Sequence, residues 1–103
     1  MLIRIVRMTF APEHIERFRS VFNTHWQTIA GFKGCTHLEL FQDQKDSQVF
    51  FTYSHWNTEQ DLENYRQSEF FRGVWSHTKT YFSAPPQAWS VKKMVGMPHK
   101  PIA

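Results

Sequence analysis

The first segment of the chain, residues 2–10, carries apolar side chains at both odd and even positions. Its sequence, LIRIVRMTF, is rich in β-branched and apolar residues, which predicts a β-strand. Because side chains alternate between the two faces of a strand, a strand that is apolar on both faces must be covered on both. One layer of helices covers only one face. The segment therefore predicts a sheet whose second face is buried by something other than its own helices.

A single apolar stripe follows this strand. Its members recur at helical spacing, which predicts an amphipathic helix over residues 12–30. Pro12 suits the first turn, because its missing N–H group would have no helical partner there, and Gly31 suits the end of the helix. The stripe consists of Ile15, Phe18, Val21, Phe22, Trp26 and Ile29.

Two further strands are predicted at residues 35–42 and 48–56, joined by a short loop of polar turn formers. Strands this close along the chain pair as an antiparallel hairpin. Thr58, with Asp61 three residues later, matches a capping box and predicts the start of a second helix. We expect a kink near Ser68, where this helix restarts.

The second helix is expected to continue to Phe82, because apolar residues keep a helical spacing up to that position. Ala84 is followed by two prolines, which predict the end of the helix. A last strand is predicted at residues 87–95, and a tail at 96–103.

The order strand, helix, strand, strand, helix, strand predicts an α+β fold of the ferredoxin-like βαββαβ type. Its four strands form one antiparallel sheet with the helices on one face. The other face would stay apolar and exposed, which is rare in a monomer, and packing against a twofold-related copy would cover it. We therefore predict a homodimer in which residues 1–95 of each chain form one domain.

Composition limits the partners of this chain. The net charge is only +3 and the basic residues are scattered, whereas nucleic-acid-binding proteins gather them on one face. No apolar stretch is long enough to span a bilayer. Cys35 is the single cysteine, so a reducing compartment fits. We expect a cytoplasmic protein that binds neither nucleic acid nor membranes.

Motifs for metal-dependent or nucleotide-dependent chemistry are missing from the sequence. There is no C-x-x-C, no H-E-x-x-H, no glycine-rich phosphate loop and no G-x-S-x-G. We therefore expect neither a metal nor a cofactor.

Aromatic side chains make up 17% of the residues, an excess that suggests a core, a pocket lined with rings, or a subunit interface. Trp26 and Trp75 are candidates for the wall of a pocket that holds a flat substrate. Tyr65 could donate a hydrogen bond to a phenolic substrate or take its proton. For the tryptophans, core and dimer packing is the alternative. For Tyr65 the alternative is an inner-face helix residue with its hydroxyl at the rim.

Several polar side chains are candidates for binding or proton transfer. His37 lies mid-strand, and a histidine pKa near neutrality suits a general base; a hydrogen-bonded interface histidine is the alternative. His25 and His77 lie beside the apolar helix stripes and are further candidates. Arg4 and Arg7 could bind an oxyanion or cross the dimer interface, and the expected alternative is an ion pair with Glu39.

Three segments together carry the pattern of a known family. Residues 50–56 end in a tryptophan, and the continuation Trp56 to Leu62 is similar to a W-x-[ST]-x-x-x-[LF] motif. Gly34 and Cys35 are similar to a turn before the second strand, and residues 62–71 to a second helix. Over residues 2–93 the chain thus resembles the antibiotic biosynthesis monooxygenase family.

The resemblance implies a dimeric α/β barrel of ferredoxin-like subunits, with a pocket between the helices and the sheet of each. Members include cofactor-independent oxygenases that act on quinols and anthrone-like polyketides, and a branch that degrades haem. Family members often carry Glu and His where this chain has Ser54 and Tyr65. The Asn, Trp and His of the haem-degrading branch fall on Val6, Tyr65 and Trp75, so that route is not expected here.

These patterns lead to one expected function and one alternative. We expect a cofactor-independent monooxygenase acting on a small, flat aromatic molecule, and the alternative is a non-catalytic module that binds a small ligand or haem. Whether the protein is an enzyme stays open at this stage. The candidate catalytic residues are Tyr65 and His37. The candidate substrate-binding residues are Val6, Phe22, Trp26, Phe71 and Trp75.

Overall fold

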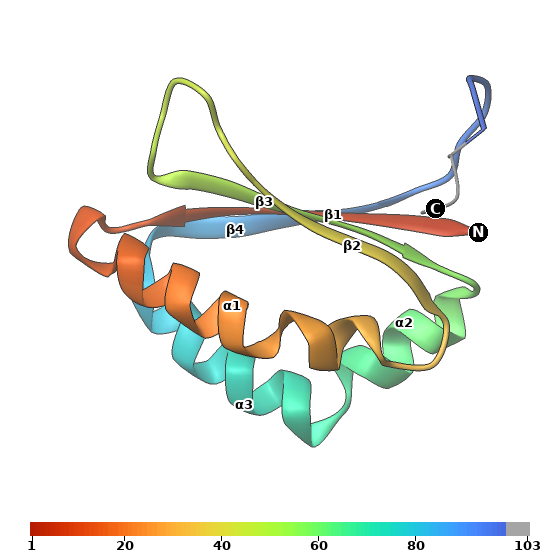
Figure 1. Ribbon diagram of the computed structural model, residues 1–103, viewed down its shortest axis with the longest axis horizontal. Coiled ribbons are helices and arrows are strands. Elements are labelled where there is room, and N and C mark those ends of the chain that lie inside the picture. The colour runs from red at the N-terminus through yellow and green to blue at the C-terminus, as the bar shows by residue number, and fades with distance from the viewer. Residues whose placement is uncertain (99–103) are drawn as a thin grey trace.

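The computed structural model describes residues 1–98 and has the predicted order of elements, with the second helix divided in two (Figure 1). Short 3-10 turns precede α1 and β4. The elements are β1 (Leu2–Phe10), η1 (Pro12–His14), α1 (Ile15–Ala30), β2 (Cys35–Gln42), β3 (Val49–Trp56), α2 (Glu59–Arg66), α3 (Glu69–Thr78), η2 (Lys79–Tyr81) and β4 (Phe82–Val91).

The four strands form one antiparallel sheet in the order β2-β3-β1-β4. β1 lies at the centre, where Val6 pairs with Thr52 of β3 and with Ala88 of β4. All the helices lie on one face of this sheet, and no described helix covers the other (Figure 1). The ferredoxin-like arrangement predicted from the sequence is confirmed.

Side-chain caps divide the second helical segment as the sequence predicts. The Thr58 hydroxyl accepts a hydrogen bond from the backbone N–H of Asp61 at 3.0 Å, which starts α2. The Ser68 hydroxyl accepts one from the N–H of Phe71 at 3.1 Å, which starts α3. The chain therefore turns between the two helices, and the turn places both over the sheet.

The last strand differs from the prediction of 87–95. It begins at Phe82, because that residue pairs with Phe10 of β1 and its ring packs on the Phe10 ring at 5.2 Å. Pro85 and Pro86 fall where the register with β1 shifts, on an edge strand, and a missing N–H group is tolerated there. The helix accordingly ends at Thr78, and the prolines belong to the strand.

The hydrophobic core fills one end of the space between sheet and helices. Phe10 is 0% exposed and stacks on Phe18 of α1 with ring centres 4.0 Å apart. Phe50 packs edge-on against both rings, and Met8 completes the cluster. These contacts join the end of β1 to the first half of α1.

Gly34 joins the first helix to the hairpin and requires glycine. Its φ is +87°, in the left-handed region, and a Cβ at this position would clash with the Asp61 side chain. Its carbonyl accepts a hydrogen bond from the N–H of Asn57 at 2.8 Å. This turn therefore holds the start of β2 against the start of α2.

Replacing Gly34 by alanine should destabilise the fold, because the new methyl group adds backbone strain and displaces Asp61. We expect G34A to lower the free energy of unfolding by about 1–3 kcal/mol, measured by urea denaturation. The matched control is G73A within α3, where a Cβ meets no atom within 4 Å. It should stabilise the helix by up to about 1 kcal/mol. Equal stability of G34A and wild type would contradict this account of the turn.

Candidate active site

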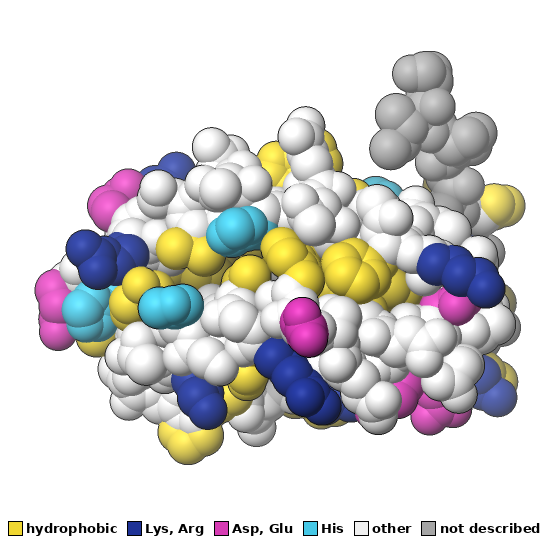
Figure 2. Space-filling view, turned by 90° about the horizontal axis from the view of Figure 1, so that it is seen from below, with side chains coloured by type: hydrophobic (Ala, Val, Ile, Leu, Met, Phe, Trp, Pro, Cys, Tyr) yellow, Lys and Arg dark blue, Asp and Glu magenta, His cyan; other side chains and the backbone are white. Residues whose placement is uncertain are grey.

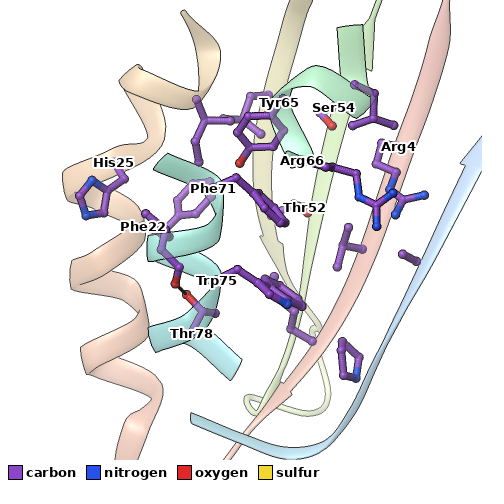
Figure 3. Close-up of a pocket in the computed structure, with 18 of the residues that line it drawn as sticks. Arg4, Phe22, His25, Thr52, Ser54, Tyr65, Arg66, Phe71, Trp75 and Thr78 are labelled. Carbon is purple, nitrogen blue, oxygen red and sulfur yellow. Dashed lines mark hydrogen bonds between the residues drawn. The ribbon is translucent and has the colours of Figure 1, made fainter. Parts of the chain in front are cut away.

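A cavity of about 250 Å³ lies between the helices and the sheet, beside the hydrophobic core (Figure 3). Its floor is formed by small side chains on the helix side of the strands: Val6, Thr52, Ser54 and Ala88. Such short side chains cannot reach the helices across the usual gap between packed layers. The cavity follows from this choice of residues on three neighbouring strands.

Four aromatic rings line the cavity in an unbroken row. Trp56 stacks on Tyr65 with ring centres 5.1 Å apart, and Tyr65 meets Phe71 edge-on at 5.0 Å. Phe71 in turn stacks on Trp75 at 5.8 Å, with the rings nearly parallel. This row, which we call the aromatic wall, offers flat apolar surfaces to a flat aromatic ligand.

Tyr65 brings a hydroxyl group to the aromatic wall. The hydroxyl points into the cavity (Figure 3), and no described residue forms a hydrogen bond with it. Burial raises the pKa of Tyr65 well above its usual value, and the nearby Cys35 thiol raises it further. The side chain is therefore a neutral hydrogen-bond donor at physiological pH, and it does not act there as a base.

Two more hydroxyl groups, of Thr52 and Ser54, lie in the floor. Ser54 is buried, and its oxygen accepts a hydrogen bond from the indole N–H of Trp56 at 3.0 Å. A hydroxyl that accepts one hydrogen bond can still donate its own proton. The floor can thus bind polar atoms at the rim of a flat ligand.

Two arginines stand at the side of the cavity nearest β4, close to each other (Figure 3). Arg4 of β1 donates a hydrogen bond to the Ser90 hydroxyl of β4 at 3.0 Å. Burial lowers the pKa of Arg4; neighbouring Arg66 lowers it further and Glu63 opposes the shift. At the other side, His25 of α1 lines the cavity with its ring edge-on to Phe70 of α3 at 5.5 Å.

Figure 2 shows the helix side of the molecule. Hydrophobic side chains form a band along the middle of this side, with histidines beside it.

Among residues 1–98, no group of three or more His, Cys, Asp or Glu side chains is arranged to hold a metal ion. None of the helices in this part of the chain is long and apolar enough to cross a membrane.

Comparison with known proteins decides the family. The family model for antibiotic biosynthesis monooxygenases matches residues 1–74. The chain belongs to the antibiotic biosynthesis monooxygenase family. A search of curated protein sequences gives no match.

Solved structures share the family fold at low sequence identity. A crystal structure of an antibiotic biosynthesis monooxygenase superimposes with a TM-score of 0.86 at 19% identity, covering 92% of this chain and 100% of the other. A conserved protein from Methanosarcina mazei Go1 has a TM-score of 0.85 at 16% identity, with 91% and 94% covered. A protein from Pseudomonas aeruginosa has a TM-score of 0.81 at 21% identity, with 91% and 94% covered.

Most residues predicted from the sequence for a family-type pocket line this cavity together. They are Val6, Phe22, Tyr65, Phe71 and Trp75. Trp26 does not line it, because its side chain lies on the outer part of α1 and is 39% exposed.

His37 does not lie at the cavity either. It is on the opposite face of the sheet, where its ring contacts Tyr53 and His55 and bonds to Glu39 at 2.5 Å. The structure therefore separates His37 from Tyr65. The expected pairing of Arg4 with Glu39 is wrong for the same reason, since Arg4 lies on the helix side and bonds to Ser90.

Sequence reasoning did not find several of the cavity residues, among them Thr52 and Arg66. Thr52 shares the parity of Ser54 and Trp56 on β3, so this periodicity could have found it once the inner face was known. Arg66 follows Tyr65 as the last residue of α2. Helical periodicity alone assigns it to solvent, and only the packing of α2 on the sheet brings its guanidinium to the cavity edge.

The raised pKa of Tyr65 predicts a specific loss of stability at high pH. Above about pH 10 an unfolded tyrosine loses its proton, while the folded state keeps the proton on Tyr65, so rising pH favours unfolding. In Y65F this contribution is absent. We expect the stability of wild type to fall more steeply than that of Y65F, by up to about 1.4 kcal/mol per pH unit. Urea unfolding at several alkaline pH values measures both slopes, and parallel slopes would refute the assignment.

Proposed function

We propose that the protein is a monooxygenase that oxidises a flat, electron-rich aromatic substrate, such as a quinol or an anthrone, without a cofactor. The observation that carries this proposal is the Tyr65 hydroxyl, held neutral among stacked rings and directed into a cavity of about 250 Å³. Membership of the antibiotic biosynthesis monooxygenase family supports the reaction type.

The cavity would orient the substrate by its shape. A flat ring system would lie along the aromatic wall, with Phe71 and Trp75 beside it and the short side chains of the sheet beneath it. Its oxygen atom would accept a hydrogen bond from Tyr65. This bond strengthens as negative charge develops on that oxygen, because a donor in a dry site stabilises an anion more than a neutral group.

The proposed oxidation begins with the loss of a proton from the substrate. Loss of a proton from an anthrone or a quinol gives an electron-rich anion, which reduces dioxygen directly. For an anthrone, the ring carbon forms a bond to oxygen, and the resulting peroxide breaks at its O–O bond. One oxygen atom stays as the new ketone, and the other leaves as water with both methylene hydrogens. The substrate thus supplies the electrons.

His25 is the side chain that we propose as proton acceptor, acting through a water molecule. It lines the cavity from α1, and histidine is the side chain whose ordinary pKa lies nearest to neutral pH. His37, the other candidate, lies on the far face of the sheet of the same chain. Tyr65, which stays protonated, complements His25 by stabilising the anion that remains.

Oxygen uptake by the purified, chelator-treated protein with a panel of quinols, anthrones and naphthols tests the proposal. We expect uptake above the autoxidation rate, and we expect Y65F to lower kcat/KM about a hundredfold, because one donor to the oxyanion is lost. The matched control is Y81F. Tyr81 packs at the margin of the core beside His14 and does not line the cavity, so its loss should leave kcat/KM unchanged.

Two results would count against the enzyme. If no substrate of the panel raises oxygen uptake, or if Y65F and Y81F behave alike, the catalytic role of Tyr65 is wrong. An unmodified ligand that purifies with the protein, without oxygen uptake, would instead support a binding module with the same cavity. A spectral shift of added haemin would identify that ligand as haem.

We further propose that the protein is a homodimer, formed by the sheet face that lies away from the helices. Trp89 is 43% exposed on this face, and Phe41 and Val91 are exposed there too. Ile5, between them in the sheet, is only half-buried. An apolar sheet face of this kind is stable in water when a second copy covers it.

A charge placed on that face should separate the subunits. We expect W89E to convert the dimer to a monomer, because a carboxylate would be buried in an apolar interface. The matched control is W26E on α1, where a tryptophan of similar exposure lies on the helix side of the molecule. Light scattering after size exclusion gives both masses. A monomeric wild type, or a dimeric W89E, would overturn the proposed interface.

A further inference from the structure

Arg4 and Arg66 are charged side chains that take no part in the oxidation proposed above. They come from separate elements, β1 and the end of α2, and both line the cavity on its β4 side. Figure 3 shows their two guanidinium groups close together. Arg4 is half-buried, and its pKa is lowered by burial and by the charge of Arg66. Two like charges held this close favour an anion between them.

The charges around this pair are not balanced, and one further negative group would neutralise them. Glu63 is the acid nearby: its carboxylate lies 3.3 Å from the Arg66 guanidinium, and it acts on Arg4 as well. The described residues that line the cavity include no Asp or Glu. Two guanidinium groups and one carboxylate give a net charge of +1. That excess matches a singly charged anion better than a dianionic phosphate.

The remaining hydrogen-bond donors also suit a carboxylate. A guanidinium group has five N–H donors in a planar fork, which fits the two oxygens of a carboxylate. Arg4 uses one donor on the Ser90 hydroxyl, and Arg66 uses one on Glu63. Donors therefore remain on both side chains. The aromatic wall begins next to the pair, because Tyr65 directly precedes Arg66 on α2.

We propose that the substrate carries a carboxylate, which Arg4 and Arg66 hold at the β4 side of the cavity while its aromatic ring lies along the aromatic wall. Calling this ligand a substrate rests on the proposed function. The binding site itself does not depend on whether the ligand is turned over. The substrate class is thus an aromatic carboxylic acid with an oxidisable ring.

Calorimetric titration with two matched probes, 2-naphthoate and 2-naphthamide, tests the carboxylate site. The probes have nearly the same size and shape and differ in charge. We expect naphthoate to bind wild type at least about tenfold more tightly than naphthamide, because a charge-assisted hydrogen bond is stronger than a neutral one. Rising ionic strength should weaken only the binding of naphthoate.

Variants assign the preference to the two arginines. R4Q and R66Q should each bring the naphthoate and naphthamide affinities to within about threefold of each other, since the charge-assisted bonds are lost. The matched control is R72Q, because Arg72 is exposed on α3 and does not line the cavity. It should keep the wild-type ratio. Thermal unfolding of each variant identifies any that does not fold; should R4Q fail to fold, R66Q decides the test.

The outcomes separate this inference from the proposed reaction. A wild-type affinity ratio near one, an unchanged ratio in R66Q, or no binding of naphthoate at millimolar concentration would each overturn the carboxylate site. Because the titration follows binding and not oxygen uptake, a clear preference for naphthoate in a protein that consumes no oxygen would keep the site. In that case only the proposed monooxygenase activity would fail.

Discussion

The contact between Phe10 and Phe18 fixes the distance between the sheet and the helices, and the cavity depends on that distance. Stacked at 4.0 Å and supported by Phe50, these rings form a rigid spacer at one end of the layer. Beyond them the middle of the sheet carries short side chains such as Val6 and Ser54. The helices cannot move down to meet these residues while the spacer holds them away. An open volume therefore remains beside a fully packed core.

The alternation of side chains along β1 and β3 gives the sheet one face toward the helices and one face away from them. Residues of even number on these strands face the helices and form the floor of the cavity, and those of odd number face the other way. Side chains on the two faces alternate along the same strands, so each outward residue is bonded directly to two inward ones. A substitution on the outer face can therefore alter the cavity through the strands, and subunit packing and substrate binding would be coupled through the sheet.

The sequence predicts the fold well because its signals are local. The caps at Thr58 and Ser68 and the stripe of α1 each act within a few residues. The start of β4 could not be found in this way. Phe82 continues the helical spacing of α3, and only its pairing with Phe10, far away in the sequence, makes it a strand residue.

The same limit applies to the site. Phe22, Tyr65, Phe71 and Trp75 belong to helix stripes whose inner side is plain, Val6 belongs to a strand that is apolar on both faces, and all five line the cavity. His37 and Glu39 alternate with Leu38 and Leu40 along β2, and this alternation already places the leucines toward the helices and His37 on the opposite face. Leu38 is accordingly the residue that reaches the cavity. Residues at the edge of a site, Arg66 above all, are placed by the packing of whole elements.

The distribution of charge favours an anion in the cavity over a neutral molecule. Tyr65 is a donor that stays protonated, Arg4 and Arg66 are cations, and no acid occurs among the described lining residues. The Tyr65 donor would lower the pKa of a phenol or an acidic C–H bond in a bound substrate by stabilising its deprotonated form, while the two arginines would hold a separate anionic group of that substrate. Since the deprotonated ring is the form that gives up electrons to dioxygen, the site would promote oxidation by favouring ionisation. A weak base, the role proposed for His25, would then be sufficient.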